Sequence, residues 1–243
     1  MATVINVTNA TVKYRQRHSL FRHSYYKALD NVSFGLKKGE TLGVIGRNGC
    51  GKSTLLKLLA GIYQPDIGSV DKGEASVSLL TLAAGFDPNL SGLDNAIISG
   101  MMLGHAKADI IEQLDDIIEY SELAEFIHEP IKTYSSGMKA RLGFSVAIKM
   151  NADVLLIDEV LGVGDANFKK KAEATMLSKI NSEQTVVLVS HSAAQIKKVC
   201  QRAVWIEKGK VQAVGDCIEV ADAYQRFLDE IKLKNKTATK KIE

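Results

Sequence analysis

A glycine-rich segment has the residue types and the spacing needed to bind phosphate groups. Gly46-Arg47-Asn48-Gly49-Cys50-Gly51-Lys52-Ser53 fits the pattern G-x-x-x-x-G-K-[ST], and Thr54 follows it. Glycines let the backbone bend until successive N–H groups face phosphate oxygens, and the helix expected next adds its positive end. Lys52 can reach the outer phosphates, and the Ser53 hydroxyl can bind Mg²⁺. The alternative is a chance glycine-rich turn, which a preceding apolar strand and a following helix make less plausible.

A second constellation lies at the end of a short apolar run, Val154 to Ile157. The two residues that follow are carboxylates: Asp158 is placed to hold Mg²⁺, and Glu159 to accept a proton from an attacking water. Alone, such a pair reads as solvated acids at a strand end. Beside a phosphate loop, and with the glutamate adjacent to the aspartate, it predicts that water is the phosphoryl acceptor. The sequence therefore predicts hydrolysis of MgATP.

Composition bounds the class of protein. The chain has 243 residues, 46% hydrophobic and 24% charged, which is an ordinary globular composition. Its net charge of +3 does not argue for nucleic acid, and we expect no nucleic-acid partner. The cysteines are widely spaced, so we expect neither a disulfide framework nor a zinc motif. The first residues do not resemble a signal peptide, and no apolar run reaches the roughly 18 residues of a membrane span.

The elements that must position these residues alternate between short apolar strands and helices, which predicts an α/β fold with a mostly parallel sheet. A hairpin turning at Lys208-Gly209 within Ala203–Gly215 predicts an antiparallel β portion, and Lys37 to Glu40 reads as another hairpin turn. Strands are expected at 4–12, 28–36, 41–45, 76–82, 154–157 and 185–190.

Helical periodicity predicts the remaining elements. Helices are expected at 53–61 and 137–150, and apolar residues at helical spacing from Ala106 to Ile127 indicate a helical insertion over about 94–134. We therefore expect one ATPase domain over residues 1–231, with a helical subdomain at about 86–136. A basic tail over 232–243 is expected to be frayed.

A family resemblance rests on the order of further motifs. Tyr134-Ser135-Ser136-Gly137-Met138 precedes the acidic strand, Gly162-Val163-Gly164-Asp165 follows it, and Val189-Ser190-His191 comes later. In this order they resemble the signature, the D-loop and the switch histidine of the ABC-transporter ATPases, over about 4–223. The resemblance implies a P-loop ATPase fold of the ABC type.

The resemblance also implies a site shared by two copies. In that family, two ATPase subunits enclose two ATP molecules, so Ser135, Ser136, Gly137 and Asp165 would face the nucleotide held by the partner copy. His191 would contact the γ-phosphate. From the spacing alone, the serines are better interpreted as a helix cap, and a lone histidine after a strand, such as His191, is often only structural. Tyr14 is the candidate to stack on adenine, and Tyr26 is its rival.

Other segments narrow the resemblance. They resemble the ATPase subunits of bacterial exporters for O-antigen, capsule and teichoic acid. The segments are Gly85 to Gly92, Tyr134 to Ala147, and Asp158 to Asp165 with Phe168. This implies a motor for lipid-linked polysaccharide, O-antigen-like first, bound to two polytopic permease subunits at the cytoplasmic face of the inner membrane. Another cargo and a soluble ABC-type ATPase unrelated to transport are the alternatives.

The chain also departs from that family. The family's glutamine between the phosphate loop and the helical insertion is missing from Leu79 to Phe86, where Thr81 is a possible substitute. An insert, Arg15 to Lys27, mixes arginines with aromatic residues. It reads either as a sensor of a polyanionic lipid head, such as the diphosphate of the carrier lipid, or as a solvated hairpin.

Overall fold

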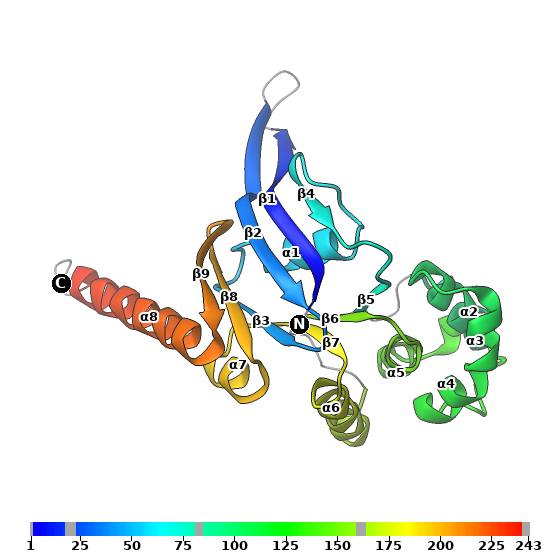
Figure 1. Ribbon diagram of the computed structural model, residues 1–243. Helices are drawn as coiled ribbons and strands as arrows, with labels where there is room; N and C mark the ends of the chain where they lie inside the picture. The colour runs from blue at the N-terminus through cyan, green and yellow to red at the C-terminus, as the bar shows by residue number, and fades with distance from the viewer. Residues whose placement is uncertain (1, 18–22, 81–84, 159–163, 240–243) are drawn as a thin grey trace. The chain divides into compact units, whose positions relative to one another are not determined.

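The computed structural model describes residues 2–17, 23–80, 85–158 and 164–239 (Figure 1). They belong to two compact units: unit 1 comprises Met1–Gly73 and Thr185–Glu243, and unit 2 comprises Glu74–Gln184. Unit 1 contains the phosphate loop, Gly46 to Thr54. Unit 2 contains the acidic strand end and the Ser-Ser-Gly segment, so the predicted site residues are divided between the units.

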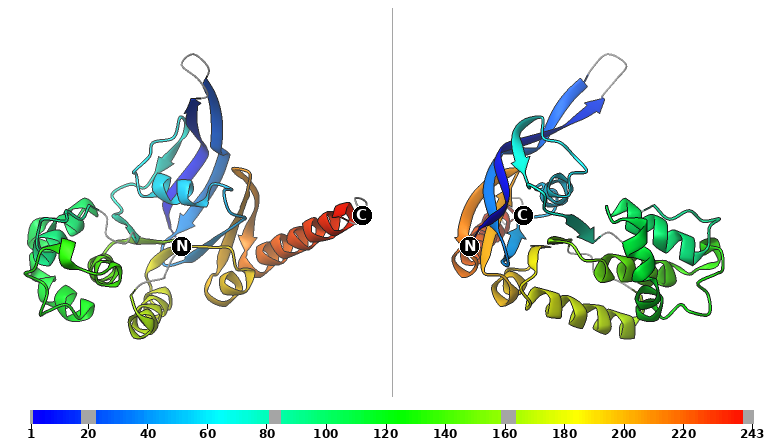
Figure 2. Two further views of the ribbon diagram at one scale, coloured as in Figure 1. Left: turned by 180° about the vertical axis from the view of Figure 1, so that it is seen from behind. Right: turned by 45° about the vertical axis from the view of Figure 1, so that its right-hand side comes forward.

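Unit 1 has an antiparallel sheet with the strand order β2-β1-β4. The strands are β1 (Thr3–Arg17), β2 (His23–Lys37) and β4 (Ile67–Asp71). β1 and β2 form a long hairpin whose outermost described pair joins Arg17 and His23, and Figure 2 shows this hairpin extending beyond β4 in both views. The insert that we expected at 15–27 is thus a continuation of these strands. Residues 18–22, Arg22 among them, and the side chain of Arg17 lie outside the described part of the chain.

The other strands of unit 1 are mostly parallel, in the order β7-β3-β8-β9. They are β3 (Thr41–Ile45), β7 (Thr185–Ser190), β8 (Arg202–Glu207) and β9 (Lys210–Asp216). Every residue of β3 and β7 is buried, which explains why both read as nearly continuous apolar runs. The expected hairpin at Lys208-Gly209 is confirmed, and both turn residues have positive φ.

The described helices of unit 1 are α1 (Lys52–Leu59), α7 (Ala193–Val199) and α8 (Cys217–Thr239). α1 ends near Gly61, whose φ of 77° suits only glycine well. α8 packs on β8 through aromatic side chains: the Trp205 ring centroid lies 5.8 Å from that of Tyr224 and 5.1 Å from that of Phe227. We expected a frayed tail from Lys232, but the backbone of α8 continues as helix to Thr239.

Unit 2 contains two parallel strands, β5 (Val77–Leu80) and β6 (Val154–Ile157), within its described residues. Its described helices are α2 (Gly92–Met102), α3 (Lys107–Glu112), α4 (Leu114–Ser121), the short 3₁₀ helix η1 (Ile131–Thr133), α5 (Ser136–Lys149) and α6 (Ala166–Ile180). The buried run of β6 brings the chain to Asp158, and α5 begins at the Ser-Ser-Gly segment. Helices α2, α3 and α4 and the 3₁₀ helix η1 lie within the expected span of about 86–136, and their separation as a subdomain stays a prediction.

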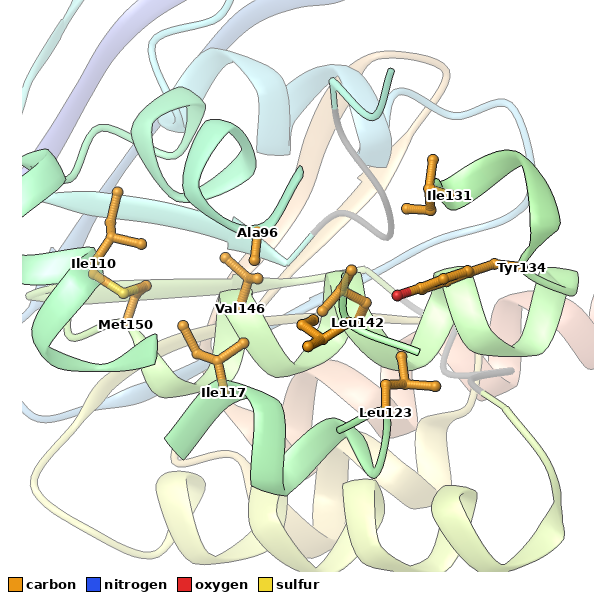
Figure 3. Packing of buried hydrophobic residues seen from close by; sticks show 10 residues of the cluster. Ala96, Ile110, Ile117, Leu123, Ile131, Tyr134, Leu142, Val146 and Met150 are labelled. Carbon is orange, nitrogen blue, oxygen red and sulfur yellow. The ribbon is translucent and has the colours of Figure 1, made fainter. Parts of the chain in front are cut away.

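Helices α2, α3, α4 and α5 and the 3₁₀ helix η1 contribute to one apolar core of unit 2 (Figure 3). On α5, Val146 lies between Ala96 of α2 and Ile117 of α4, and Leu142, one turn away, lies toward Leu123; all of these residues are fully buried. The hydroxyl of buried Tyr134 donates to the carbonyl of Phe126 at 2.6 Å, which satisfies the polar end of the ring. This core fixes the start of α5, where the Ser-Ser-Gly segment lies.

Some elements differ from the sequence-based expectation. The helical stretch expected at 106–127 is broken at Gln113, and α4 ends where Glu122 adopts a φ of 57°. The turn at Lys37 to Glu40 is not a hairpin, because β2 and β3 belong to different sheets. β4 was not expected at all. Within the described residues, none of the helices combines the length and the apolar character needed to cross a membrane.

Candidate functional site

The phosphate loop joins buried β3 to α1. Gly51 caps α1 with φ 111°, and Gly49 has φ 75°, so both need the left-handed conformations that glycine adopts freely. A glycine cap offers no side chain to the first N–H groups of α1, and the first turn of this helix has no acidic residue. The positive end of the α1 dipole therefore has no carboxylate from its own first turn beside it, which suits an anion.

Close contacts explain two of the glycines. A Cβ atom on Gly46 would lie 2.2 Å from the carbonyl oxygen of Ile206, and one on Gly51 would lie 2.4 Å from that of Ala28. The loop is also tied by a hydrogen bond from the Gly209 N–H to the Cys50 carbonyl at 2.9 Å. The wall of the loop is thus made by β2 and by the β8–β9 turn. Burial raises the pKa of the Cys50 thiol, which favours its neutral form.

Lys52 lies buried inside the loop. Its ammonium donates to the carbonyl oxygens of Gly46 at 2.7 Å and of Arg47 at 3.0 Å. Both acceptors belong to the loop itself, so the cation is held in the concavity where the motif places phosphate oxygens. This placement suits the role predicted for Lys52, and Ser53 follows it at the start of the exposed side of α1.

Both candidate aromatic residues lie beside the phosphate loop. Tyr14 and Tyr26 are cross-strand partners in β1 and β2. The Tyr14 hydroxyl is 3.3 Å from Oγ1 of Thr54, and the Tyr26 hydroxyl donates to the carbonyl of Gly49 at 3.3 Å. A cavity of about 300 Å³ opens on the Tyr26 side, lined by Tyr26, Arg47, Asn48, Gly49, Cys50, Glu207 and Lys208. The structure therefore brings both tyrosines to the site and does not choose between them.

An ion pair beside the loop was missed from the sequence. The Nε of Arg47 donates to both carboxylate oxygens of Glu207, at 3.0 and 3.1 Å, and its Nη2 also contacts that carboxylate. The carboxylate raises the pKa of the Arg47 guanidinium. The two residues are 160 positions apart in the chain, so neither the loop motif nor periodicity signals the contact.

His191 is the remaining predicted residue of unit 1. It follows β7 directly, with its side chain exposed. Ser190 and Ser192 on either side form the start of α7: Ser192 caps the helix, and the Ser190 hydroxyl donates to Gln195 at 2.8 Å. This framework fixes the backbone of His191 at the carboxyl end of β7, the edge of a parallel sheet where ligands bind in open α/β folds.

In unit 2, Asp158 follows β6 and is half-buried. Its neighbour Glu159 lies outside the described residues, as do Thr81, Gly162 and Val163. Hydroxyl and carboxylate oxygens such as those of Ser53 and Asp158 are the donors that Mg²⁺ prefers, and the ion completes its shell with phosphate and water. The donor chemistry of these two residues fits Mg²⁺.

The Ser-Ser-Gly segment begins α5. Ser135 is the N-cap, and its hydroxyl accepts from the Met138 N–H at 3.2 Å; Ser136 is the first residue of the helix. The cap function that the sequence left open is therefore real. A Cβ atom on Gly137 would meet nothing closer than 3.7 Å. The start of α5 is thus open to an approaching group.

Asp165 caps the next helix, α6. Its carboxylate accepts from the N–H groups of Phe168 at 3.0 Å and Asn167 at 2.9 Å, and these hydrogen bonds lower the pKa of Asp165. The preceding Gly164 has φ 66°, and its Cα would lie 3.8 Å from a Cβ on Gly137. The structure therefore brings the predicted signature and the described end of the predicted D-loop together within unit 2.

Comparisons with known proteins agree with this arrangement. The sequence pattern of the ABC transporter family matches residues 29–162. The O-antigen export system ATP-binding protein RfbB of Klebsiella pneumoniae is 38% identical over 94% of this chain and 100% of its own length. RfbB of Myxococcus xanthus is 46% identical over 84% of this chain and 47% of its own length. The teichoic acids export ATP-binding protein TagH of Bacillus anthracis is 42% identical over 84% of this chain and 37% of its own length. The chain thus spans about half the length, or less, of these last two relatives.

Solved structures show the same fold. A dimeric bacterial ABC transporter cassette is 22% identical with a TM-score of 0.68, covering 88% of this chain and 98% of that chain. An ATP-binding subunit of an ABC transporter is 20% identical with a TM-score of 0.70, covering 96% and 99%. The expected fold class, a P-loop α/β fold of the ABC type, is confirmed. By its sequence pattern and its full-length relative, the chain belongs to the ABC transporter family.

Proposed function

We propose that this chain binds and hydrolyses MgATP as the motor subunit of an ABC exporter for a lipid-linked, O-antigen-like polysaccharide. The observation that supports the cargo is the relative from Klebsiella pneumoniae, which aligns along its whole length at 38% identity and is named for O-antigen export. The ATPase part is supported by the phosphate loop, in which glycine backbone, buried Lys52 and the start of α1 converge on one concavity.

Each predicted residue has a proposed task. The loop N–H groups and Lys52 bind the phosphates, while Ser53 and Asp158 hold Mg²⁺, which neutralises phosphate charge. Glu159 accepts a proton from the attacking water as its oxygen bonds to the γ-phosphorus and the bond to the bridging oxygen breaks. His191 donates to the γ-phosphate, whose negative charge it helps to disperse.

The base is proposed to stack on Tyr14, with Tyr26 as the alternative. Tyr14 is fixed by its contact with Thr54 and by the edge of Tyr63, at 6.0 Å between ring centroids. Tyr14→Ala should weaken binding of a fluorescent ATP analogue several-fold, whereas Tyr25→Ala, at a 68% exposed neighbour, should not. A larger loss in Tyr26→Ala would reverse the assignment.

We further propose a homodimer that closes on ATP and reopens after hydrolysis. Ser135, Ser136, Gly137 and Asp165 of one copy then face the nucleotide of the other. The helical segment at 86–134 passes this motion to two polytopic permease subunits, so the chain lies peripherally at the cytoplasmic face of the bacterial inner membrane. Only the difference in ATP affinity between the open and closed states can drive that change.

A second candidate cargo is teichoic acid. The relative from Bacillus anthracis named for its export is 42% identical over 84% of this chain. Export of a different cargo and a soluble ABC-type ATPase outside transport are further alternatives.

The first experiment is purification of the tagged chain from its native cell, with membranes solubilised in mild detergent. We expect a polytopic membrane protein to co-purify at equal stoichiometry. A chain recovered with ribosomes, with DNA or alone would overturn the export proposal. If a permease co-purifies, depletion of the chain should cause lipid-linked polysaccharide to accumulate inside the cell. An unchanged amount of polysaccharide at the cell surface would reject that cargo.

A further inference from the structure

The outer wall of the phosphate loop is formed by a distant part of the chain. The β8–β9 turn approaches the loop through the Gly209 N–H, which donates to the Cys50 carbonyl, and through Ile206, whose carbonyl lies against Gly46. Glu207, between these two residues, forms the ion pair with Arg47. Contacts from Ile206, Glu207 and Gly209 therefore join the end of β8 and the following turn to the loop.

The ion pair has the geometry of a strong interaction. Arg47 binds both oxygens of the Glu207 carboxylate in a forked arrangement, and the carboxylate side chain is only 9% exposed. Forked arginine–carboxylate pairs fix the orientation of both groups, and burial of one partner reduces screening by water. Arg47 is thus held in one direction although its own side chain is 40% exposed.

A helix braces the same arginine. The Arg47 guanidinium lies 5.4 Å from the ring centroid of Phe227 on α8, and that ring packs against Trp205 of β8. A cation over an aromatic face is attracted by the ring, and this contact also limits the positions of the guanidinium. Arg47 is therefore held from β8 and from α8 at once.

What the brace holds is the backbone around Lys52. The carbonyl of Arg47 accepts from the Lys52 ammonium at 3.0 Å and from the Cys50 N–H at 3.3 Å. A shift of Arg47 would move one of the two carbonyls that orient the ammonium. It would also disturb the turn that directs the loop N–H groups.

We propose that Glu207 and Phe227 are positioning residues for nucleotide binding, which act by holding Arg47 and thereby the phosphate loop and Lys52. This inference rests on the proposed binding of ATP at the loop. Two other readings compete with it: the ion pair only stabilises the fold, or Arg47 itself contacts the nucleotide and Glu207 restrains it.

The test compares two matched ion pairs at opposite ends of β8. Arg202, at the start of the strand, donates from Nη1 to both carboxylate oxygens of buried Glu40, at 2.9 and 3.1 Å. Glu207→Gln and Glu40→Gln therefore remove one carboxylate charge each from similar pairs. The Kd for MgATP is measured by titration calorimetry, and the melting temperature is measured in parallel.

We expect Glu207→Gln and Arg47→Lys each to raise the Kd about tenfold, or about 1.4 kcal/mol, because both lose the forked geometry. Glu40→Gln should lower the melting temperature at least as much as Glu207→Gln does, but it should leave the Kd for MgATP unchanged. Equal Kd values in Glu207→Gln, Arg47→Lys and the parent would overturn the proposal. If Glu207→Gln does not fold, Arg47→Lys and Phe227→Leu provide the same comparison.

A double-mutant cycle separates positioning from direct contact. Arg47→Ala combined with Glu207→Gln should bind ATP no more weakly than Arg47→Ala alone, because the second change removes nothing further. Additive losses would reject the coupling. A Kd that is unchanged or lower in Glu207→Gln but raised in Arg47→Ala would assign direct contact to Arg47 instead. A parent chain that binds no MgATP would overturn the proposed function itself.

Discussion

Gly46 and Gly51 show that single atoms limit the shape of the phosphate loop. At both positions the space for a Cβ atom is occupied by a backbone carbonyl, which cannot rotate away as a side chain can. The sequence motif already marks these positions as glycine. The contacts add the reason, because β2 and the β8–β9 turn approach the loop too closely for any other residue.

A first prediction concerns Gly46→Ala. The added methyl would lie 2.2 Å from the Ile206 carbonyl, so we expect a loss of about 1–3 kcal/mol in the free energy of unfolding and weaker ATP binding. Urea denaturation measures the first effect. Gly215→Ala in β9 is the control, because its Cβ would meet nothing within 4 Å. Equal stability of the two variants would contradict the close-contact argument.

A second prediction concerns the proposed base. Glu159→Gln should lower kcat by about 10²–10⁴-fold, because the amide cannot accept the proton of the attacking water. ATP binding should persist, since the amide retains the size and polarity of the side chain. Phosphate release and nucleotide titration are the measurements. Glu173→Gln, on the exposed side of α6, should match the parent, and a Glu159→Gln variant that turns over normally would remove the base assignment.

At this scale the sequence predicts residues with local patterns and misses those with distant partners. The phosphate loop can be identified from the sequence because its chemistry depends on the spacing of residues within one short segment. The pairing of Arg47 with Glu207 depends on β8 ending beside the loop, which only the folded sheet determines. The hydroxyl contacts of Tyr14 and Tyr26 likewise require the register of β1 and β2.

Among the elements, helix α3 shows how burial differs between adjacent positions that face different directions. Ile110 and Ile111 are neighbours on α3, yet Ile110 is fully buried and Ile111 is 52% exposed. Ile110 belongs to the core of unit 2 and lies against Gly100 of α2. The two positions form a matched pair of the same residue type in the same helix.

A third prediction uses this pair. Ile110→Ala should cost about 2–5 kcal/mol in the free energy of unfolding, because it leaves a cavity in the apolar core. Ile111→Ala should stay within about 0.5 kcal/mol of the parent. Chemical denaturation followed by circular dichroism gives both values. Similar losses in the two variants would mean that α3 does not present the buried face described above.

Elements with a strong pattern were predicted correctly. β3, β6 and β7 are uniformly buried, so their apolar runs are distinct in the sequence. β4 was missed because its residues are mostly exposed and alternate little, and because its position depends on pairing with β1. The end of α4 could not be predicted from propensity. It depends on Glu122, whose carboxylate contacts Lys171 at 2.8 Å and Arg141 at 3.6 Å from two other helices.

For the molecule as a whole, the proposed homodimer can be separated from the fold of the single chain. Gly137 has only ordinary contacts around its missing Cβ. A side chain there is therefore tolerated within one copy. An acidic side chain near the start of α5 also suits the positive end of the helix.

A fourth prediction follows for Gly137→Asp in the Glu159→Gln background. The single chain should melt at the temperature of its parent or above, but ATP should no longer produce a dimer, because the carboxylate would repel the γ-phosphate held by the partner copy. Sedimentation velocity with and without ATP measures this. Gly215→Asp is the control and should dimerise. An ATP-dependent dimer of the Gly137→Asp variant would contradict the proposed shared site.

The hydrogen bonds of Lys52 also affect how the loss of activity in a Lys52 variant should be interpreted. Its ammonium donates to the carbonyls of both Gly46 and Arg47 and so links the two ends of this part of the loop. Replacing Lys52 by alanine or methionine removes both hydrogen bonds and leaves two carbonyls in need of new donors, so the conformation of the loop is altered as well as its affinity for ATP. A cell that carries such a variant and fails in export could be lacking an assembled complex, and the amount of complex in its membranes has to be measured before the defect is ascribed to ATP.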